Sequence, residues 1–557
     1  MIVNNSWPEY LGIRLVILLM RDLGLLCLSY FFIVFALGGV TAIAHPVSIT
    51  IEALGAIEIL FYVSFFLPYR FFLQSHRPYK PIPLNKEERA KLFYKGVSLI
   101  PDAEQFIRKW TNNAHLEDIR IDNVKDWLLW ALFETENIRD IGHDTQDELD
   151  EYIEHIRQQL GLDLKPGRGP AETLRLSFDP IYMEHRSLVY YLAIGSLDMM
   201  MCLWLLASGY KFYRQPRSTF FKVFPLRPLS LLSPNASDAP DMSFWYRPHR
   251  SKTHRPVIII HGLGIGLIPY LFWMATIPND IGIVAVEMLP ISTRVTSQVL
   301  PPTSELCQSI ATIAAQIRKK DPGAWNDFVL VTSSYGTMLV KGLVEHPDFG
   351  PRISGNVLCD PVALLLHLPD VAFNFTRRTP GRSRRGRPGR ANEWEITWAS
   401  ATEAGTAYSL ARRFCWRECA LWREDIMPSM RDAENGQYGR GHQNEQSLSC
   451  KGMRTTVIQG GEDCIAAAKN VAAYVYSGRV TYDYFDIQAW NQYQWNGTEE
   501  LELVFLDGKD HGQGMMVPRP SKKIRQVIEG YCRRALQAPV RPTTFTSIYD
   551  EDPQGKF

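Results

Sequence analysis

The sequence lacks clustered cysteines and any excess of charge of one sign. Its nine cysteines are scattered along 557 residues without a pair of CxxC motifs, so neither a zinc site nor a disulfide framework is indicated. Lysine and arginine total 60 against 59 aspartates and glutamates, a formal net charge of +1 that gives no sign of a nucleic-acid partner. We therefore expect no metal, no cofactor and no nucleic acid.

Two long apolar runs lie near the N-terminus. Residues 23–44 carry no charged side chain and are long enough to cross a bilayer, and too long for the apolar core of a cleaved signal peptide. Residues 49–69 form a second run, which Glu52 and Glu58 weaken as a span. We expect residues 1–75 to form a membrane anchor of one or two transmembrane helices.

The placement of positive charge predicts the orientation of this anchor. Arg14 and Arg21 precede the first run, the connection between the runs has no lysine or arginine, and basic residues cluster between residues 70 and 91. Because positive residues favour the cytosolic side, this pattern predicts a hairpin in an endomembrane with both ends, and the catalytic part of the chain, in the cytosol.

A third apolar segment, residues 188–210, interrupts a helical region expected over residues 76–244. Asp198 lies near its middle, and a carboxylate is costly inside a bilayer. A third span would also move the rest of the chain to the other side of the membrane. We therefore expect a membrane-interacting helix that lies in the interface or packs over the catalytic domain.

The pattern changes after a polar linker at residues 246–256. Short β-branched strands then alternate with helical stretches, which is typical of a parallel sheet with crossover helices. We expect an α/β domain over residues 245–540 and a disordered tail over residues 541–557.

One expected strand ends in two serines that are candidate nucleophiles. At a nucleophile elbow, the residues two before and two after the serine must be small, because they pack closely. Ser333 would place the bulky Tyr335 at one of these positions, whereas Ser334 places Thr332 and Gly336 there. The pattern favours Ser334, although threonine stands where glycine is usual.

Three further strand ends supply the partners that a serine nucleophile needs. Upstream, a strand runs into a loop of His261, Gly262, Leu263 and Gly264, which can aim the Leu263 amide at an oxyanion beside the Tyr335 amide. Downstream, another strand ends at Asp463, with Glu462 as the neighbouring alternative, and the last strand leads to His511.

This set of motifs resembles the α/β-hydrolase superfamily over a little more than half of the chain. The stretches HGLGIGLIPY, SSYGT and DHGQ look most like membrane-associated α/β-hydrolases of filamentous fungi. The resemblance implies a Ser334–Asp463–His511 triad, with the Leu263 and Tyr335 amides as the oxyanion hole. Some superfamily members carry the acid after an earlier strand, which makes Asp360 the competing acid.

The resemblance also implies a cap over the pocket, inserted at about residues 363–452. Its apolar stretch at residues 362–375 suits an apolar substrate. Seven arginines at residues 377–390 leave two interpretations open, a patch for anionic lipid head groups or a disordered loop without function.

The sequence thus predicts an α/β-hydrolase fold with a helical cap and an N-terminal membrane-anchoring region. The predicted activity is cleavage of an ester, thioester or related acyl bond in a lipid-like or secondary-metabolite substrate by a serine hydrolase. Two alternatives stay open: a non-catalytic membrane-tethered interaction protein, and an acyltransferase of secondary metabolism. The sequence does not identify the acyl group or the pathway.

Overall fold

The computed structural model describes residues 6–161, 163–380, 390–430, 452–515 and 522–534. The expected tail at 541–557, most of the arginine-rich segment and part of the expected cap lie outside the described residues.

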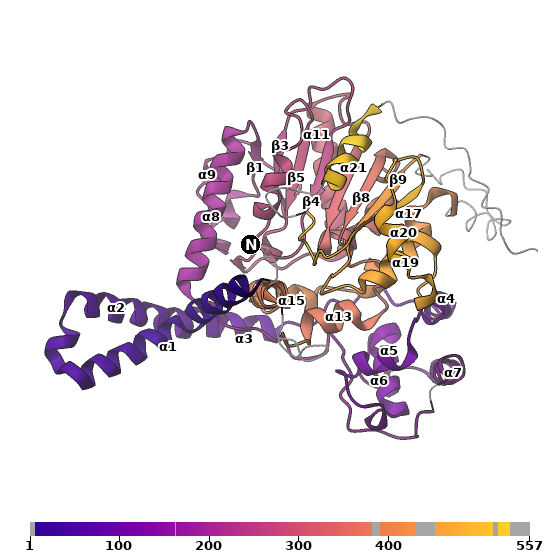
Figure 1. Ribbon diagram of the computed structural model, residues 1–557, viewed down its shortest axis with the longest axis horizontal. Coiled ribbons are helices and arrows are strands. Elements are labelled where there is room, and N and C mark those ends of the chain that lie inside the picture. The colour runs from indigo at the N-terminus through magenta and orange to yellow at the C-terminus, as the bar shows by residue number, and fades with distance from the viewer. Residues whose placement is uncertain (1–5, 162, 381–389, 431–451, 516–521, 535–557) are drawn as a thin grey trace, which may run out of the picture.

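The core of the molecule is an eight-stranded sheet with the order β1-β3-β5-β4-β7-β8-β9-β10 (Figure 1). Strand β3 runs antiparallel to β1 and β5, and the remaining neighbours pair in parallel. This order and these directions are those of the α/β-hydrolase fold, which confirms the predicted fold class. The strands, with the small β2–β6 pair outside this sheet, are β1 Lys211–Tyr213, β2 Val223–Phe224, β3 Ser243–Arg247, β4 Val257–Ile260, β5 Ile283–Glu287, β6 Val295–Thr296, β7 Phe328–Ser333, β8 Ile353–Cys359, β9 Arg454–Gly460 and β10 Leu501–Leu506.

The sheet begins upstream of residue 245, the boundary that the sequence pattern had indicated. Strand β1 pairs with β3 at the edge of the sheet and directly follows the third apolar segment. Three residues are too few to show a strand period, so sequence alone could not separate β1 from that segment.

Helices cover both faces of the sheet because its central strands are apolar on both sides. In β4, Ile258 and Ile260 pack with α11 on one face, whereas Val257 and Ile259 pack with α8 and α21 on the other. The helices outside the N-terminal region are α4 Lys86–Ser98, α5 Ala103–Trp110, α6 Ile121–Phe133, α7 His143–Leu160, α8 Leu188–Ala207, α9 Leu229–Leu232, α10 Leu271–Met274, α11 Thr303–Lys320, α12 Val340–Glu345, α13 Pro369–Thr376, α14 Ala391–Ile396, α15 Ala404–Arg412, α16 Trp416–Cys419, α17 Arg423–Ile426, α19 Ala468–Ser477, α20 Ile487–Gln492 and α21 Lys522–Cys532. Helices α13 to α17 lie between β8 and β9 in the chain and form the helical cap.

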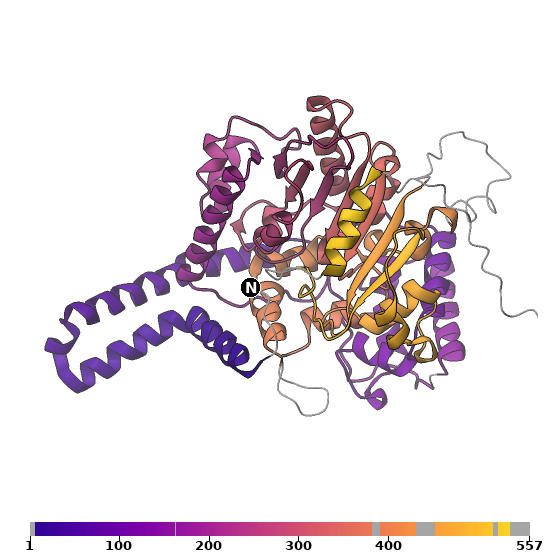
Figure 2. The same ribbon diagram turned by 45° about the horizontal axis from the view of Figure 1, so that its top comes forward.

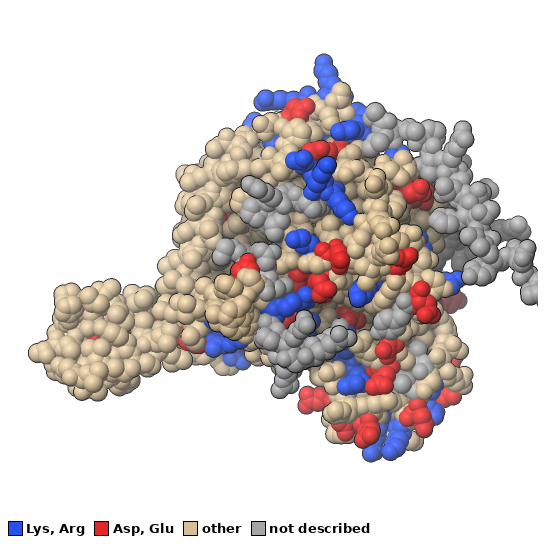
Figure 3. All heavy atoms as spheres, in the orientation of Figure 1, with Lys and Arg blue, Asp and Glu red and all other residues tan. Residues whose placement is uncertain are grey.

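An N-terminal helical hairpin projects from this body (Figures 1 and 2). Its first arm is α1 (Trp7–Ile43), and its second arm joins α2 (Pro46–Phe61), the π-helical turn η1 (Tyr62–Phe66) and α3 (Leu67–Ser75). The projecting part is almost free of charged side chains (Figure 3). Both arms are long and apolar enough to cross a membrane, with mean hydropathies of 2.3 and 1.8.

The first arm starts earlier than the apolar run at 23–44 suggested. A capping box of Ser6 and Glu9 starts α1, and the helix continues through both arginines that precede the run. Arg14 lies over the Trp394 ring of the cap at 3.7 Å, and Arg21 pairs with the neighbouring Asp22. These charges therefore belong to the base of the hairpin, next to the body, and leave its projecting part apolar.

The two acidic residues that weakened the membrane prediction have different environments. Glu58 lies at the base of the hairpin, where its carboxylate accepts hydrogen bonds from the amides of Leu188 (2.7 Å) and Val189 (3.0 Å). It thereby satisfies free amides at the N-terminus of α8, where a negative charge is favourable. Glu52 lies farther out along α2.

Helix α8 is attached to the sheet by buried ion pairs. Asp198 contacts Arg294 at 2.6 Å and accepts a hydrogen bond from Arg227 Nε at 2.9 Å, and Arg227 also pairs with Glu287 of β5 at 2.6 Å. The opposite face of α8 exposes apolar side chains. One face of this helix therefore packs on the body of the molecule, and the other is exposed and apolar.

Candidate active site

Ser334 lies at a sharp turn between β7 and the following helical turn η7 (Ser334–Leu339). Its φ of 51° falls in the left-handed region, which is strained for a residue other than glycine and typical of a nucleophile elbow. A Cβ at Gly336 would lie 2.7 Å from the Ile260 carbonyl oxygen, and one at Gly262 would lie 2.8 Å from the Ser334 Cβ. The turn therefore needs glycine at both positions, and it accommodates Thr332, which is fully buried in β7.

The structure brings Ser334, His511 and Asp463 into one hydrogen-bonded chain. Ser334 Oγ lies 2.9 Å from His511 Nε2, and His511 Nδ1 lies 2.8 Å from Asp463 Oδ2. This order of hydroxyl, imidazole and carboxylate is the one by which a base activates a serine and an acid orients the base. Ser333 remains in β7 with an extended φ of −134°.

The Asp463 carboxylate is held by several donors besides the imidazole. It accepts hydrogen bonds from the amides of Ile465 (2.7 Å) and Ala466 (3.0 Å) and from Gln459 Nε2 (3.1 Å). Burial alone would raise the pKa of this carboxyl group, but His511 and the hydrogen bonds outweigh burial and keep the pKa below its ordinary value. Asp463 is therefore ionised and fixed in position.

His511 shows the complementary effect. Burial alone would lower its pKa, but the charge and hydrogen bond of Asp463 outweigh burial and raise the pKa to about 9. With Nδ1–H donating to Asp463, the neutral ring presents the Nε2 lone pair to Ser334.

We expect the activity to depend on the protonation of His511. Protonated His511 cannot accept the Ser334 proton, so kcat/KM for p-nitrophenyl butyrate should rise with pH up to about 9. Asp463→Asn should shift this rising limb to lower pH, because the carboxylate is what raises the pKa of the imidazole. A pH–rate profile of both proteins checks this; an alkaline shift in the variant would contradict it.

Asp360, the competing acid, has a different set of partners. Its carboxylate accepts hydrogen bonds from the amides of Gly460 and Gly512, both at 2.8 Å. Burial raises the pKa of this carboxyl group to about 6. Asp360 therefore joins the end of β9 to the loop next to His511, whereas Asp463 makes the bond to the imidazole.

Two further acidic residues surround the same loop. Glu462, the other alternative, points outward and pairs with Arg390 at 3.2 Å. Asp510 is fully buried and accepts hydrogen bonds from the amides of Cys464 (2.9 Å) and His511 (2.8 Å). Sequence reasoning missed Asp510 as a support of this loop, although its place directly before His511 in the DHG stretch was a usable signal.

His261 shapes the glycine-rich loop that follows β4. Its Nε2 accepts a hydrogen bond from the Met288 amide at 3.0 Å, and its Nδ1 lies 2.7 Å from the Gly262 carbonyl oxygen. Burial lowers the pKa of this imidazole, which keeps the ring neutral and suited to these two bonds. The Gly262 amide in turn donates to the Tyr270 hydroxyl at 3.0 Å. His261 and Gly262 thus fix the path of this loop next to Ser334.

The two amides expected to stabilise an oxyanion flank the serine. Leu263 and Tyr335 line the same pocket as Ser334. Tyr335 is the second residue of η7, and the first amides of a helix have no acceptor within it. Gly264, at φ 128°, turns the loop away after Leu263. The shared pocket is compatible with the expected role of these two amides as an oxyanion hole.

The pocket at Ser334 is a narrow apolar slot with a volume of about 40 Å³. Three tryptophans and a set of aliphatic and phenylalanine side chains from the helical region and the cap form most of its wall. They include Trp110, Trp130, Trp416, Leu366, Phe375 and Phe414. The slot therefore suits an apolar group attached to the atom that Ser334 attacks. Among the described residues, no group of three or more His, Cys, Asp or Glu side chains is arranged to hold a metal ion.

Comparison with known proteins adds only a distant likeness. No protein-family model and no curated protein matches the sequence. Solved structures similar to the chain include a membrane phospholipase A described as a bacterial virulence factor (11% identity, 62% of this chain and 94% of that chain, TM-score 0.35). A lipase in an open form is also similar (13% identity, 54% of this chain and 97% of that chain, TM-score 0.30). So is a carboxylesterase from Bacillus subtilis (10% identity, 50% of this chain and 83% of that chain, TM-score 0.28). At these values the likeness assigns neither activity nor substrate.

Proposed function

We propose that the protein is a membrane-anchored serine hydrolase that cleaves an ester, thioester or related acyl bond of an apolar substrate. The observation that carries this proposal is the hydrogen-bonded chain from Ser334 through His511 to Asp463, at 2.9 and 2.8 Å. The apolar slot beside the serine supports an apolar acyl group. We propose a lipid-like or secondary-metabolite substrate, since the apolar stretch at residues 362–375 also suits an apolar molecule.

The reaction follows from the positions of these groups. His511 Nε2 takes the proton of Ser334, whose oxygen attacks the acyl carbonyl carbon, and the resulting oxyanion is stabilised by the Leu263 and Tyr335 amides. His511 then gives its proton to the departing alcohol or thiol, which leaves an acyl-enzyme. His511 then takes a proton from water, whose oxygen attacks the acyl carbon, and returns this proton to the Ser334 oxygen as the acyl–serine bond breaks; the acid and the free Ser334 hydroxyl are released.

A fluorophosphonate probe tests whether this chemistry occurs. Such a probe reacts with a serine only when a base has activated it, so the wild-type protein should be labelled and Ser334→Ala should not. Equal labelling of both proteins, or none of the folded wild type, would instead favour the non-catalytic interaction protein.

We also propose that the hairpin spans the membrane and that α8 lies in the interface on the same side as the catalytic domain. The exposed face of α8 carries Leu192, Leu197, Met200, Leu203 and Leu206. Asp198 forms buried ion pairs with Arg227 and Arg294. These pairs favour a helix packed on the body of the molecule rather than a third transmembrane span. The basic residues at both outer ends of the hairpin support a cytosolic body.

Removing only the projecting part of the hairpin is expected to release the protein from the membrane. Gly24 and Glu58 face each other across the two arms, since a Cβ at Gly24 would lie 3.5 Å from that of Glu58. Residues 25–57 can therefore be replaced by a short Gly-Ser linker while the contacts at the base are kept. We expect a shift from the carbonate-resistant membrane fraction to a soluble or weakly bound one, because the long apolar arms are gone.

Fractionation followed by immunoblotting checks this result. Leu37→Ala, a single change at an exposed position of the first arm, is the control and should remain in the membrane fraction. Unchanged carbonate resistance of the shortened protein would transfer the anchor to α8.

A further inference from the structure

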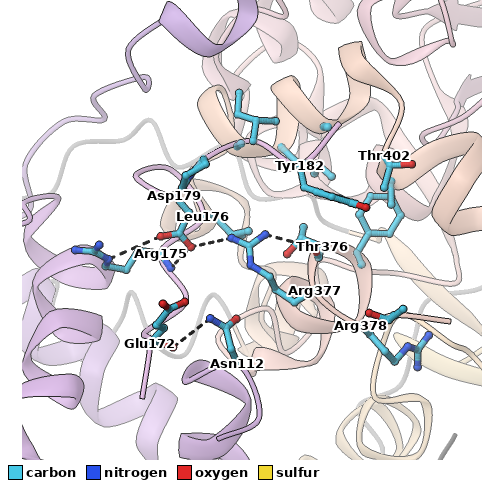
Figure 4. Close-up of a pocket in the computed structure, with 18 of the residues that line it drawn as sticks. Asn112, Glu172, Arg175, Leu176, Asp179, Tyr182, Thr376, Arg377, Arg378 and Thr402 are labelled. Carbon is cyan, nitrogen blue, oxygen red and sulfur yellow. Dashed lines mark hydrogen bonds and ion pairs between the residues drawn. The ribbon is translucent and has the colours of Figure 1, made fainter. Parts of the chain in front are cut away.

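A large cleft lies next to the slot at Ser334. It has a volume of about 850 Å³ and lies between residues 168–184 and the cap helices α13, α14 and α15. Arg377 lies within it, between Asp179 and Thr376 (Figure 4). The proposed chemistry at Ser334 does not use this cleft, although Arg377 and Arg378 of its wall belong to the arginine-rich segment at residues 377–390.

The cleft and the slot share part of their walls. Leu176, Phe375, Thr376 and Leu410 line both cavities. Only this one layer of side chains therefore lies between the slot and the cleft, and one molecule that occupied the two cavities would contact it. The slot accepts an apolar group, whereas the cleft is lined by polar and charged side chains as well as apolar ones. The two cavities together match an amphiphilic ester.

The charges of the described residues in the cleft wall are balanced. Four arginines and four carboxylates among these residues line the cleft. At its centre Arg377 pairs with Asp179 at 2.8 Å, and Arg175 lies 4.0 Å from the same carboxylate. A wall whose described side chains carry no net charge, but offer many donors and acceptors, favours a polar group that also carries no net charge.

The edge of the cleft contacts both arms of the hairpin. Trp394 lines the cleft and lies under the Arg14 guanidinium of α1, and its own Nε1 is buried without a hydrogen-bond partner among the described residues. Ile181, also a lining residue, exchanges two hydrogen bonds with Gln74 of α3, at 2.6 and 3.3 Å. The cleft therefore lies at the base of the hairpin, next to the proposed membrane anchor.

We propose that the cleft binds the polar head group of an amphiphilic ester that carries no net charge, while the acyl group enters the slot at Ser334. This inference rests on the proposed serine-hydrolase function and adds its substrate class. The two parts of the site meet at the wall formed by Leu176, Phe375, Thr376 and Leu410, and the Arg377–Asp179 pair sets the head-group preference.

Opposite charge changes across this one ion pair test the proposal. The substrates are lysophosphatidylcholine, whose head is zwitterionic, and lysophosphatidylglycerol of the same acyl chain, whose head is anionic. We expect the wild-type protein to give a higher kcat/KM with the zwitterionic lipid. Arg377→Gln leaves the wall with a net negative charge and should raise this preference by about threefold or more, whereas Asp179→Asn should lower it by a similar factor.

The paired design separates binding from structure. Both variants break the same ion pair, so a merely structural role would move the preference in the same direction or leave it unchanged, and either result overturns the proposal. Arg525→Gln, which removes an exposed arginine on α21, is the matched control and should leave the preference unchanged. Cleavage of p-nitrophenyl butyrate but of neither lysolipid would also overturn the proposal. Loss of the proposed function itself is recognised separately, because the wild-type protein would then fail to react with fluorophosphonate.

Discussion

Replacing Ser334 with alanine is expected to lower ester turnover by about 10⁴-fold or more, and replacing His511 with alanine should cost a similar factor. The serine supplies the oxygen that attacks the acyl carbon, and the imidazole 2.9 Å away is the base that activates it. Because the two groups act as one unit, the double variant should be little slower than either single variant. Rates measured with p-nitrophenyl butyrate, after purification of folded protein, check this.

The neighbouring serine provides the matched control. Ser333→Ala removes a hydroxyl of the same kind one residue earlier, but Ser333 belongs to β7, and the structure places the Ser334 hydroxyl at His511. We expect Ser333→Ala to change turnover by less than about tenfold. If it were as slow as Ser334→Ala while the melting temperature was unchanged, Ser333 would be the nucleophile.

The loops that carry the site could be predicted because each follows a strand with a clear apolar pattern. The carboxyl ends of parallel strands meet at one edge of a sheet, so the loops after β4, β7, β9 and β10 had to lie near one another. The steric requirement at the turn selected Ser334 over Ser333. Thr332, the one departure from the usual pattern, lies within β7, and the tightest packing falls on Gly262 and Gly336 instead.

The resemblance pointed to Asp463 as the acid, but no pattern in the sequence separates it from Asp360. Asp360 follows β8 as Asp463 follows β9, and both strands end at the same edge of the sheet. Which carboxylate reaches the imidazole depends on the path of a few loop residues, and no periodic pattern records that path. The structure separates them by their partners, since Asp360 accepts two backbone amides whereas Asp463 contacts His511.

The large cleft was equally beyond sequence reasoning. It forms where residues 168–184, which have little regular secondary structure, meet cap helices that follow much later in the chain. Arg412 of α15, for example, donates hydrogen bonds to the carbonyl oxygens of Ser177 (2.9 Å) and Asp179 (3.1 Å). Such contacts depend on tertiary packing. Neither residues 168–184 nor the cap helices carry a sequence motif that predicts contact between them.

A comparison of Asp463→Asn with Asp360→Asn tests which carboxylate orients His511. Asparagine at 463 has nearly the same shape, but its amide can hold the imidazole in the wrong tautomer and supplies no charge to stabilise the imidazolium. We expect kcat to fall by roughly 10⁴-fold while the protein stays folded. The measurements are kcat with p-nitrophenyl butyrate and the melting temperature of each variant.

Asp360→Asn should lower the stability of the protein more clearly and kcat less than Asp463→Asn does. Its carboxylate accepts the amides of Gly460 and Gly512 with separate oxygens, and an asparagine side chain can accept only one of them, so a buried amide loses its partner. We expect a clear loss in melting temperature and a fall in kcat of about tenfold, through displacement of the loop next to His511. Only loss of the acid itself removes both the correct tautomer of His511 and the charge that stabilises the imidazolium. If Asp360→Asn lowered kcat more than Asp463→Asn did, the acid would therefore be Asp360, in the loop after β8.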